Sequence, residues 1–327
     1  MSKPKYSVIL PNYLNPHDRF ATYGGEKKAA TELIDMCGKQ GAFQGVEIIF
    51  GESITSINQK NKKGIKAALE KNGLQLAGVL ADTYYSEFAK GSLGSADAKT
   101  RGKAIDLVKQ AMDIAAELNC SYVGQWPGQD GWDYYFEMDY QKMYENWVSG
   151  MRELAYYNPK INLGLEPKPY EPRAYSFIDN NTKVLLMARD IDRKNVGLTL
   201  DIGHSMYGHE SLAEAVALAQ KEHRLFHLHI NDNYGDVDGD MPFGSVHLLS
   251  LVEFFYWLKK TDYQGWHSVD IFPYRTNPAE TVLESQKWMQ AIYNLVDRAG
   301  MDNLANLTKK SDGVAMLKFF RELLLEK

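Results

Sequence analysis

Cysteine is scarce in this sequence, with only two in 327 residues. Cys37 and Cys120 are far apart and lack Cys-x-x-Cys spacing. This spacing argues against both a zinc knuckle and the disulfide framework of small secreted domains. We interpret both thiols as small core or helix residues.

Long apolar runs and an excess of positive charge are also missing. No run of 18 apolar residues occurs, and the N-terminus leads into a strand-like segment without the apolar centre of a signal peptide. We therefore expect no membrane contact and a cytoplasmic location. With 37 Lys and Arg against 42 Asp and Glu, the net charge is −5, so no global positive field attracts nucleic acid.

Glycine-rich phosphate-binding motifs are absent as well. No Gly-x-Gly-x-x-Gly follows the first strand-like segment, and no Gly-x-x-x-x-Gly-Lys-Ser/Thr occurs anywhere. The sequence therefore lacks the motif that usually indicates an open nucleotide-binding sheet. The 44% hydrophobic and 24% charged residues instead indicate a globular protein with a large core.

What the sequence does have is a regular alternation of β-rich runs and amphipathic helical stretches, which is typical of repeated βα units. The predicted strands are 6–11, 45–51, 74–82, 121–126, 161–167, 196–201, 224–230 and 266–271. The predicted helices are 26–40, 58–72, 97–119, 140–157, 181–193, 212–223, 248–261 and 278–298.

Eight such units predict an α/β fold, a (β/α)8 TIM barrel. We assign residues 1–300 to the catalytic barrel. Residues 301–327 form a C-terminal helical tail, a short polar stretch followed by a helix at 313–325. The apolar face of that last helix needs a partner, either the barrel wall or another subunit.

The most informative segment is Glu166–Arg173, which follows the fifth predicted strand. Residues two apart on a strand point to the same face, so we expect Glu166 and Lys168 to project into one cavity. Three prolines in the segment cannot donate ladder hydrogen bonds, and the strand should end where the charged groups emerge. A solvated surface turn is the alternative interpretation.

Carboxylates or imidazoles stand at the ends of four successive predicted strands, the fifth to the eighth. In TIM barrels the chemistry lies at the C-terminal ends of the strands. Carboxylates with one imidazole favour an octahedral divalent cation, Mn²⁺, Mg²⁺ or Co²⁺, over zinc. The candidate ligands are Glu166, Asp201, His229 and Asp270.

A second set of candidate ligands follows the sixth and seventh strands. His204 lies three residues after Asp201, and an acidic, glycine-containing loop carries Asp238 and Asp240. These residues, with Asp201 shared, are candidates for a second ion, an arrangement suited to polarising adjacent oxygens. A solvated acidic turn is the alternative.

Aromatic residues cluster after the fourth strand, at Trp126, Trp132, Tyr134, Tyr135 and Phe136. Such a cluster either lines a pocket for a substrate with apolar faces or packs as a structural unit.

These motifs resemble those of the xylose isomerase family, within the wider group of divalent-metal TIM barrels. Glu166-Pro-Lys-Pro-Tyr-Glu-Pro-Arg173 is similar to the family's strand-five signature, and Asp201-Ile-Gly-His204 to its Glu-Val-Gly-His segment. Asp238-Gly-Asp240-Met-Pro-Phe-Gly244 is similar to its Asp-x-Asp-Leu-x-Phe-Gly loop, and Trp126-Pro-Gly-Gln-Asp-Gly131 to its Trp-Gly-Gly-Arg-Glu-Gly. Because the loop after strand seven is one residue shorter than in the family, Asp236 is an alternative ligand.

The resemblance implies a small sugar as the binding partner and a homodimer or homotetramer. It implies that the Glu binds metal, the Lys contacts the substrate carbonyl oxygen and the Trp forms an apolar wall beside the sugar. The catalytic residues implied are Lys168, Glu166, Asp270 and Asp238, and the substrate-binding residues Trp126, Lys168 and His204.

Departures from the family narrow the expected activity. Strand two lacks the His-Asp element implicated in opening the sugar ring, and the Glu, Asp, His, Asp set is closest to that of L-rhamnose isomerase. We expect a metal-dependent aldose–ketose isomerase for an unphosphorylated pentose, deoxyhexose or branched pentose such as D-apiose. The alternatives are a ketose 3-epimerase, which uses one metal held by Glu, Asp, His and Glu, and a non-catalytic sugar-binding protein on the same fold.

Overall fold

A closed barrel of eight parallel strands forms the centre of the computed structural model, which describes residues 3–15 and 25–326. The strand order around the barrel is β1-β10-β9-β8-β6-β4-β3-β2. The strands are β1 (Lys5–Ile9), β2 (Gly45–Ile49), β3 (Gln75–Leu80), β4 (Tyr122–Gln125), β6 (Asn162–Leu165), β8 (Val196–Asp201), β9 (Leu225–Ile230) and β10 (Trp266–Val269). The TIM barrel and all eight predicted strands are confirmed.

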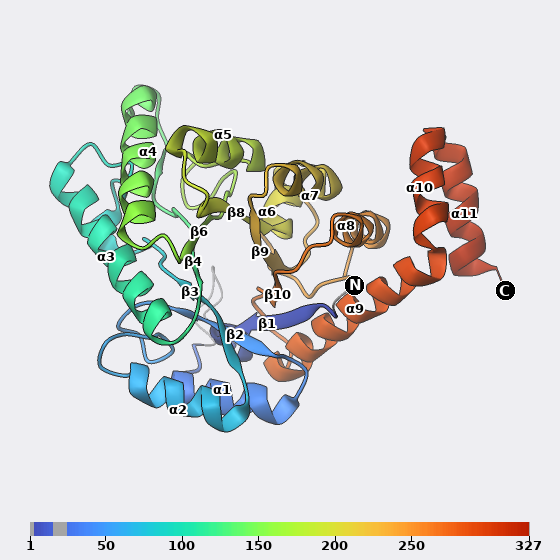
Figure 1. Cartoon of the computed structure of the whole chain (residues 1–327), viewed down its shortest axis with the longest axis horizontal. Helices are drawn as coiled ribbons and strands as arrows, with labels where there is room; N and C mark the ends of the chain where they lie inside the picture. Colours follow the sequence, from blue (N-terminus) through green and yellow to red (C-terminus); the bar gives the residue numbers. More distant parts are fainter. Residues whose placement is uncertain (1–2, 16–24, 327) are drawn as a thin grey trace.

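Helices surround this barrel, and their apolar faces cover the outer side of the strands (Figure 1). The main helices are α1 (Ala30–Gln40), α2 (Lys62–Asn72), α3 (Ala98–Glu117), α4 (Tyr140–Tyr157), α5 (Asn181–Ile191), α7 (Leu212–Lys221), α8 (Leu248–Lys260) and α9 (Pro278–Ala299). Short helices are η1 (Leu10–Tyr13), η2 (Ser86–Phe88) and α6 (Ile202–Tyr207).

Local sequence signals set the helix ends. Side chains of Asp97, Asp139, Asn180 and Asn277 accept hydrogen bonds from first-turn backbone N–H groups, which satisfies donors that have no partner within the helix. Gly41 ends α1 with φ 67°, a left-handed conformation that suits glycine.

Beyond residue 298, the predicted helix at 313–325 is present as α11 (Gly313–Leu325). The short polar stretch before it also forms a helix, α10 (Met301–Lys310). α10 packs against α8 and α9, and α10 and α11 extend beyond the end of α9 (Figure 1). The division into barrel and tail stays a prediction.

Irregularities interrupt two of the barrel's strand pairs. The register of β2 against β3 shifts between Val46 and Glu47, and that of β8 against β9 shifts between Leu198 and Thr199. Such shifts re-aim side chains next to functional sites. Glu47 and Thr199 are both fully buried inside the barrel.

Loops at the C-terminal ends of the strands add a two-stranded sheet that the sequence patterns do not predict. It pairs β5 (Gly131–Trp132) with β7 (Tyr175–Ser176) in antiparallel fashion. In the described ranges, no helix is long and apolar enough to cross a bilayer.

Candidate metal centre and substrate cavity

A cavity of about 430 Å³ opens at the C-terminal ends of the barrel strands. Most of the predicted site residues line it, namely Trp126, Glu166, Lys168, His204, His229, Asp238, Asp240 and Asp270. Glu166 and Lys168 therefore face one cavity, as their spacing predicts, and the solvated-turn alternative for them is wrong. Asp236, in contrast, is exposed.

The first predicted ligand set forms one compact cluster. Donor atoms of Glu166, Asp201, His229 and Asp270 lie within 4.8 Å of one another, and the first three residues are buried. His229 Nδ1 is 3.0 Å from Glu166 Oε2 and 3.5 Å from Asp270 Oδ2. This nitrogen has no hydrogen-bond partner in the described part of the chain, as expected of an atom that ligates a metal.

Asp201 is held in place from two sides. Its carboxylate caps α6 by accepting from the backbone N–H of His204 at 2.9 Å. The side-chain amide of Asn231 donates to both carboxylate oxygens, at 3.2 and 3.1 Å. The side chain of this candidate ligand is therefore held in position by protein groups alone.

The pKa values in the cluster indicate that nearby positive groups do not balance all of its negative charge. Burial raises the pKa of Asp270 to about 8, and the nearby Asp201 and Glu166 add to that effect. Burial opposes ionisation of Glu166 too, but the His229 and His204 imidazoles hold its pKa below the usual value. A divalent cation supplies the missing positive charge, so these four residues fit such an ion.

The second predicted ligand set is arranged differently. His204 Nε2 lies 3.3 Å from Asp238 Oδ2, and Lys168 Nζ donates to the same oxygen at 2.6 Å. Burial opposes protonation of His204, yet Asp201 and Asp238 raise its pKa to about 9. Within the described ranges, His204, Asp238 and Asp240 do not join a compact donor set of the first kind. A second ion at these residues stays a prediction.

Charge is distributed unevenly between the two aspartates of this loop. Burial raises the pKa of Asp240 well above its usual value, and the charges of Asp238 and Asp270 reinforce the effect. Burial disfavours the Asp238 anion as well, but His204 and Lys168 outweigh that cost and lower its pKa. Of the two carboxylates, Asp238 is therefore the one whose negative charge is better balanced by neighbouring positive groups.

The patterns that identify the site miss Glu47 and His227. Glu47 on β2 is fully buried and lies 2.7 Å from His227 Nε2 and 3.5 Å from His229 Nε2. Burial opposes the charge on Glu47, but His227 and His229 outweigh it and lower its pKa. The signal in the sequence is a charged residue within an otherwise apolar strand.

Asp82 is a third missed residue, two positions after the end of the strand β3. It lines the cavity and accepts from the backbone N–H of Trp126 at 3.3 Å. Burial raises its pKa to about 7, and the Glu166 charge contributes.

The aromatic cluster divides into three parts. Trp126 lines the cavity and stacks on Tyr84 with ring centroids 5.3 Å apart. Trp132 packs against Tyr140 and Tyr175 outside the cavity. The remaining members are largely exposed, so the cluster neither lines one pocket nor packs as one unit; they are Tyr134, Tyr135 and Phe136.

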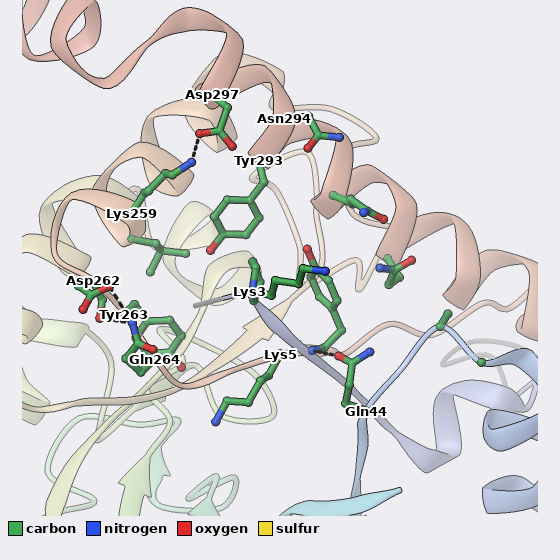
Figure 2. A pocket seen from close by; sticks show the side chains of 17 residues that line it. Lys3, Lys5, Gln44, Lys259, Asp262, Tyr263, Gln264, Tyr293, Asn294 and Asp297 are labelled. Atoms are coloured by element: carbon green, nitrogen blue, oxygen red, sulfur yellow. Dashed lines mark hydrogen bonds and ion pairs between the residues drawn. The ribbon is translucent and has the colours of Figure 1, made fainter. Parts of the chain in front are cut away.

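A larger cavity, of about 830 Å³, lies at the opposite end of the barrel (Figure 2). It lies beside the starts of β1 and β2, between α8 and α9, and Figure 2 shows Lys259 directed at Asp297 across its rim. Lysine, tyrosine and amide side chains dominate its lining, and no compact acidic or imidazole cluster is among the residues described there. We therefore assign the metal site to the smaller cavity.

A known sugar isomerase is similar to this chain in sequence. A xylose isomerase from Thermus thermophilus is 29% identical over 225 residues, which cover 66% of this chain and 58% of that protein. The chain thus aligns with less than two thirds of the length of that relative.

Solved structures of sugar epimerases share the fold. A D-tagatose 3-epimerase-like protein superposes with a TM-score of 0.71 at 21% identity, covering 90% of this chain and 98% of that one. A D-allulose 3-epimerase from Methylomonas sp., in complex with D-allulose, gives 0.68 at 18% identity, with the same coverage of 90% and 98%. At these identities the likeness is one of fold.

A family model described as "Xylose isomerase-like TIM barrel" matches residues 34–292. That range runs from α1 into α9 and contains every residue of the compact donor set. The chain therefore belongs to the xylose isomerase-like TIM barrel family.

Proposed function

We propose that the protein is a divalent-metal-dependent enzyme that inverts C3 of a small unphosphorylated ketose. The observation that carries this proposal is the compact donor set of Glu166, Asp201, His229 and Asp270 beside the cavity. These four residues would hold the ion, whose chemistry when bound is to polarise the carbonyl oxygen and a neighbouring hydroxyl oxygen of the sugar.

We assign the proton transfers at carbon to two carboxylates of the set. Glu166 follows β6 and Asp270 follows β10, so they approach from strands on the two sides of the β8–β9 pair. In the proposed reaction, one takes the C3 proton next to the C2 carbonyl, and the other delivers a proton to the opposite face of C3. The electron pair of the broken C–H bond moves onto the carbonyl oxygen and returns to C3 when the new bond forms.

Other lining residues hold the sugar in place. Lys168 donates to the oxygen that gains negative charge, a contact that strengthens as the reaction proceeds. Trp126, whose ring centroid is 5.4 Å from Lys168 Nζ, provides an apolar wall that excludes water from the reacting carbons.

Similarity to solved structures supports an epimerase, because the D-tagatose 3-epimerase-like protein and the D-allulose 3-epimerase each superpose on this chain over 98% of their own length. The second predicted ligand set also fits a reaction with one ion, because among the described residues Asp238 pairs with Lys168 and does not join a compact donor set.

A D₂O experiment tests the proposal. D-fructose, D-tagatose and L-ribulose are incubated in D₂O with Mn²⁺, Mg²⁺ or Co²⁺, and the quenched, chelator-treated products are analysed by NMR and chromatography. We expect the C3 epimer with deuterium at C3, and a loss of turnover in Glu166→Gln of about 10²- to 10⁴-fold. Turnover that survives exhaustive chelation, or no C3 exchange with any ketose, would refute it.

An aldose–ketose isomerase is the second candidate, favoured by the 29% identity to a xylose isomerase. It predicts an aldose product and no inversion at C3. The same experiment separates the two, because an enediol between C1 and C2 introduces deuterium at those carbons and a hydride shift introduces none.

A further inference from the structure

A buried carboxylate connects two histidines inside the barrel, directly below the proposed metal site. His227 and His229 are two residues apart on β9 and therefore point to the same side of the strand. Oε1 of Glu47 is 2.7 Å from His227 Nε2, and Oε2 is 3.5 Å from His229 Nε2. One carboxylate thus uses each of its oxygens for a different imidazole.

We propose that Glu47 is a positioning residue for the metal site. A carboxylate only accepts hydrogen bonds, so the His229 nitrogen that faces it, Nε2, carries the proton. The other nitrogen, Nδ1, then presents its lone pair toward Glu166 and Asp270. Glu47 thereby fixes both the tautomer and the ring orientation of the only imidazole in the compact set, among the described residues. This inference rests on the proposed metal-dependent function.

Glu47 is itself held in position by His227, the imidazole that does not belong to the proposed ligand set. His227 stacks on Tyr122 with centroids 4.3 Å apart and an interplanar angle of 11°. The Tyr122 hydroxyl is 2.6 Å from Thr199 Oγ1. A continuous chain of contacts, all buried, therefore runs from Thr199 through Tyr122, His227 and Glu47 to His229.

Glycines make room for this chain of contacts. A Cβ added at Gly78 would meet Glu47 Oε2 at 2.8 Å and the Tyr122 ring at 2.9 Å. One added at Gly164 would meet the Tyr122 ring at 2.7 Å. The register shifts at Glu47 and Thr199 occur at the two strand positions that carry the polar groups. Backbone irregularity and small residues thus occur where the polar chain needs space.

The same three residues could hold an ion of their own, since Glu47, His227 and His229 also form a compact cluster. The 2.7 Å separation of Glu47 Oε1 from His227 Nε2 favours direct hydrogen bonding over a bridging ion. We therefore assign the cluster to positioning.

The test is metal binding by Glu47→Gln, measured on the full chain. An amide keeps the shape of the side chain, but its NH₂ end cannot accept a hydrogen bond, so one histidine loses its acceptor. We expect Mn²⁺ and Co²⁺ affinities to fall about 10- to 100-fold by calorimetry, and the visible spectrum of bound Co²⁺ to change. His227→Gln should weaken binding less, because His229 keeps its acceptor.

A matched control is His267→Gln, at a buried histidine of the neighbouring strand β10 whose Nε2 pairs with Tyr293 outside this chain of contacts. It should lower the unfolding temperature and leave metal affinity unchanged. Unchanged affinity in Glu47→Gln, with normal binding by the wild type, overturns the inference alone. Absence of metal binding by the wild type overturns the metal site and this inference together.

A measurement on the wild type covers the case in which Glu47→Gln does not fold. Imidazole ¹⁵N NMR of the Mg²⁺-loaded protein reports the tautomer of His229, with the signal assigned by its loss in His229→Gln. We expect a proton on Nε2 and none on Nδ1. A proton on Nδ1 and none on Nε2 would overturn the inference.

Discussion

Lys168 and Asp238 form a buried ion pair in which Nζ lies 2.6 Å from Oδ2, although the two residues are 70 positions apart in sequence. Burial disfavours the Lys168 ammonium, but Asp238 more than compensates and raises its pKa. The lysine therefore stays charged inside the cavity, where a substrate oxygen that gains negative charge would meet it.

Removal of the ammonium tests this pair. Lys168→Met leaves Asp238 buried beside fewer positive groups, so we expect a loss of about 3 kcal/mol in the free energy of unfolding. Turnover should fall about 10²- to 10³-fold. Urea denaturation and kcat measure the two effects separately. The double variant Lys168→Met with Asp238→Asn should recover stability but not turnover; recovery of both would show that the lysine acts only structurally.

Metal removal tests the compact donor set. At a metal concentration about 100 times Kd, binding should stabilise the fold by about 2.7 kcal/mol, or about 4 °C in Tm. Asp270→Asn should lose most of that shift. Its Tm in EDTA should stay close to the wild-type value, because Asp270, with its pKa raised to about 8, is largely protonated at neutral pH without an ion.

Asp236→Asn is the control for that experiment, since Asp236 is an exposed carboxylate of the nearby acidic loop. Differential scanning fluorimetry with and without Mn²⁺ should give the full shift for Asp236→Asn. An equal shift in Asp270→Asn would exclude Asp270 as a ligand.

Gly78 offers a test of the space around Glu47. Gly78→Ala should cost about 1 to 3 kcal/mol, because its Cβ would approach Glu47 Oε2 to 2.8 Å, and it should weaken Mn²⁺ binding. Gly102→Ala, in α3 with no atom within 4 Å of the added Cβ, should instead raise stability by up to about 1 kcal/mol. Chemical denaturation compares the two; equal effects would contradict close packing at Gly78.

Mild acid should destabilise the barrel through His267. Burial lowers the pKa of His267 to about 3, against 6.5 for the unfolded chain. Below pH 6.5 the unfolded state takes up a proton that the folded state refuses, so this contribution is lost as pH falls from about 6.5 toward 3. The loss is about 2 kcal/mol at pH 5. Denaturation at pH 7 and pH 5 should show a smaller difference in His267→Phe, and an unchanged difference would contradict this origin.

The barrel is predictable from sequence because each βα unit carries its own apolar periodicity and turn signals. The same reliance on periodicity explains what the patterns miss. α10 is polar on most of its surface, with only Leu304 buried, and β5 and β7 have two residues each. Neither kind of element carries enough periodic apolar residues to be recognised.

The donor set is predictable because its members stand at the ends of successive strands, where the fold gathers them. Glu47 lies in the middle of β2, and its partners are on β9. The ion pair of Lys168 with Asp238 joins a strand end to a long loop. Such contacts form between elements that face each other across the interior of the closed barrel. Residue spacing along one strand does not reveal them.

The chain of contacts from Thr199 to His229, below the proposed metal site, also limits which substitutions the barrel can accept. Residues 78 and 164 accept no side chain larger than hydrogen without disturbing Glu47 or Tyr122. Substitutions that reshape the cavity are therefore expected to be tolerated at its rim, where Tyr84, Tyr85 and Tyr274 border it, and not at its floor.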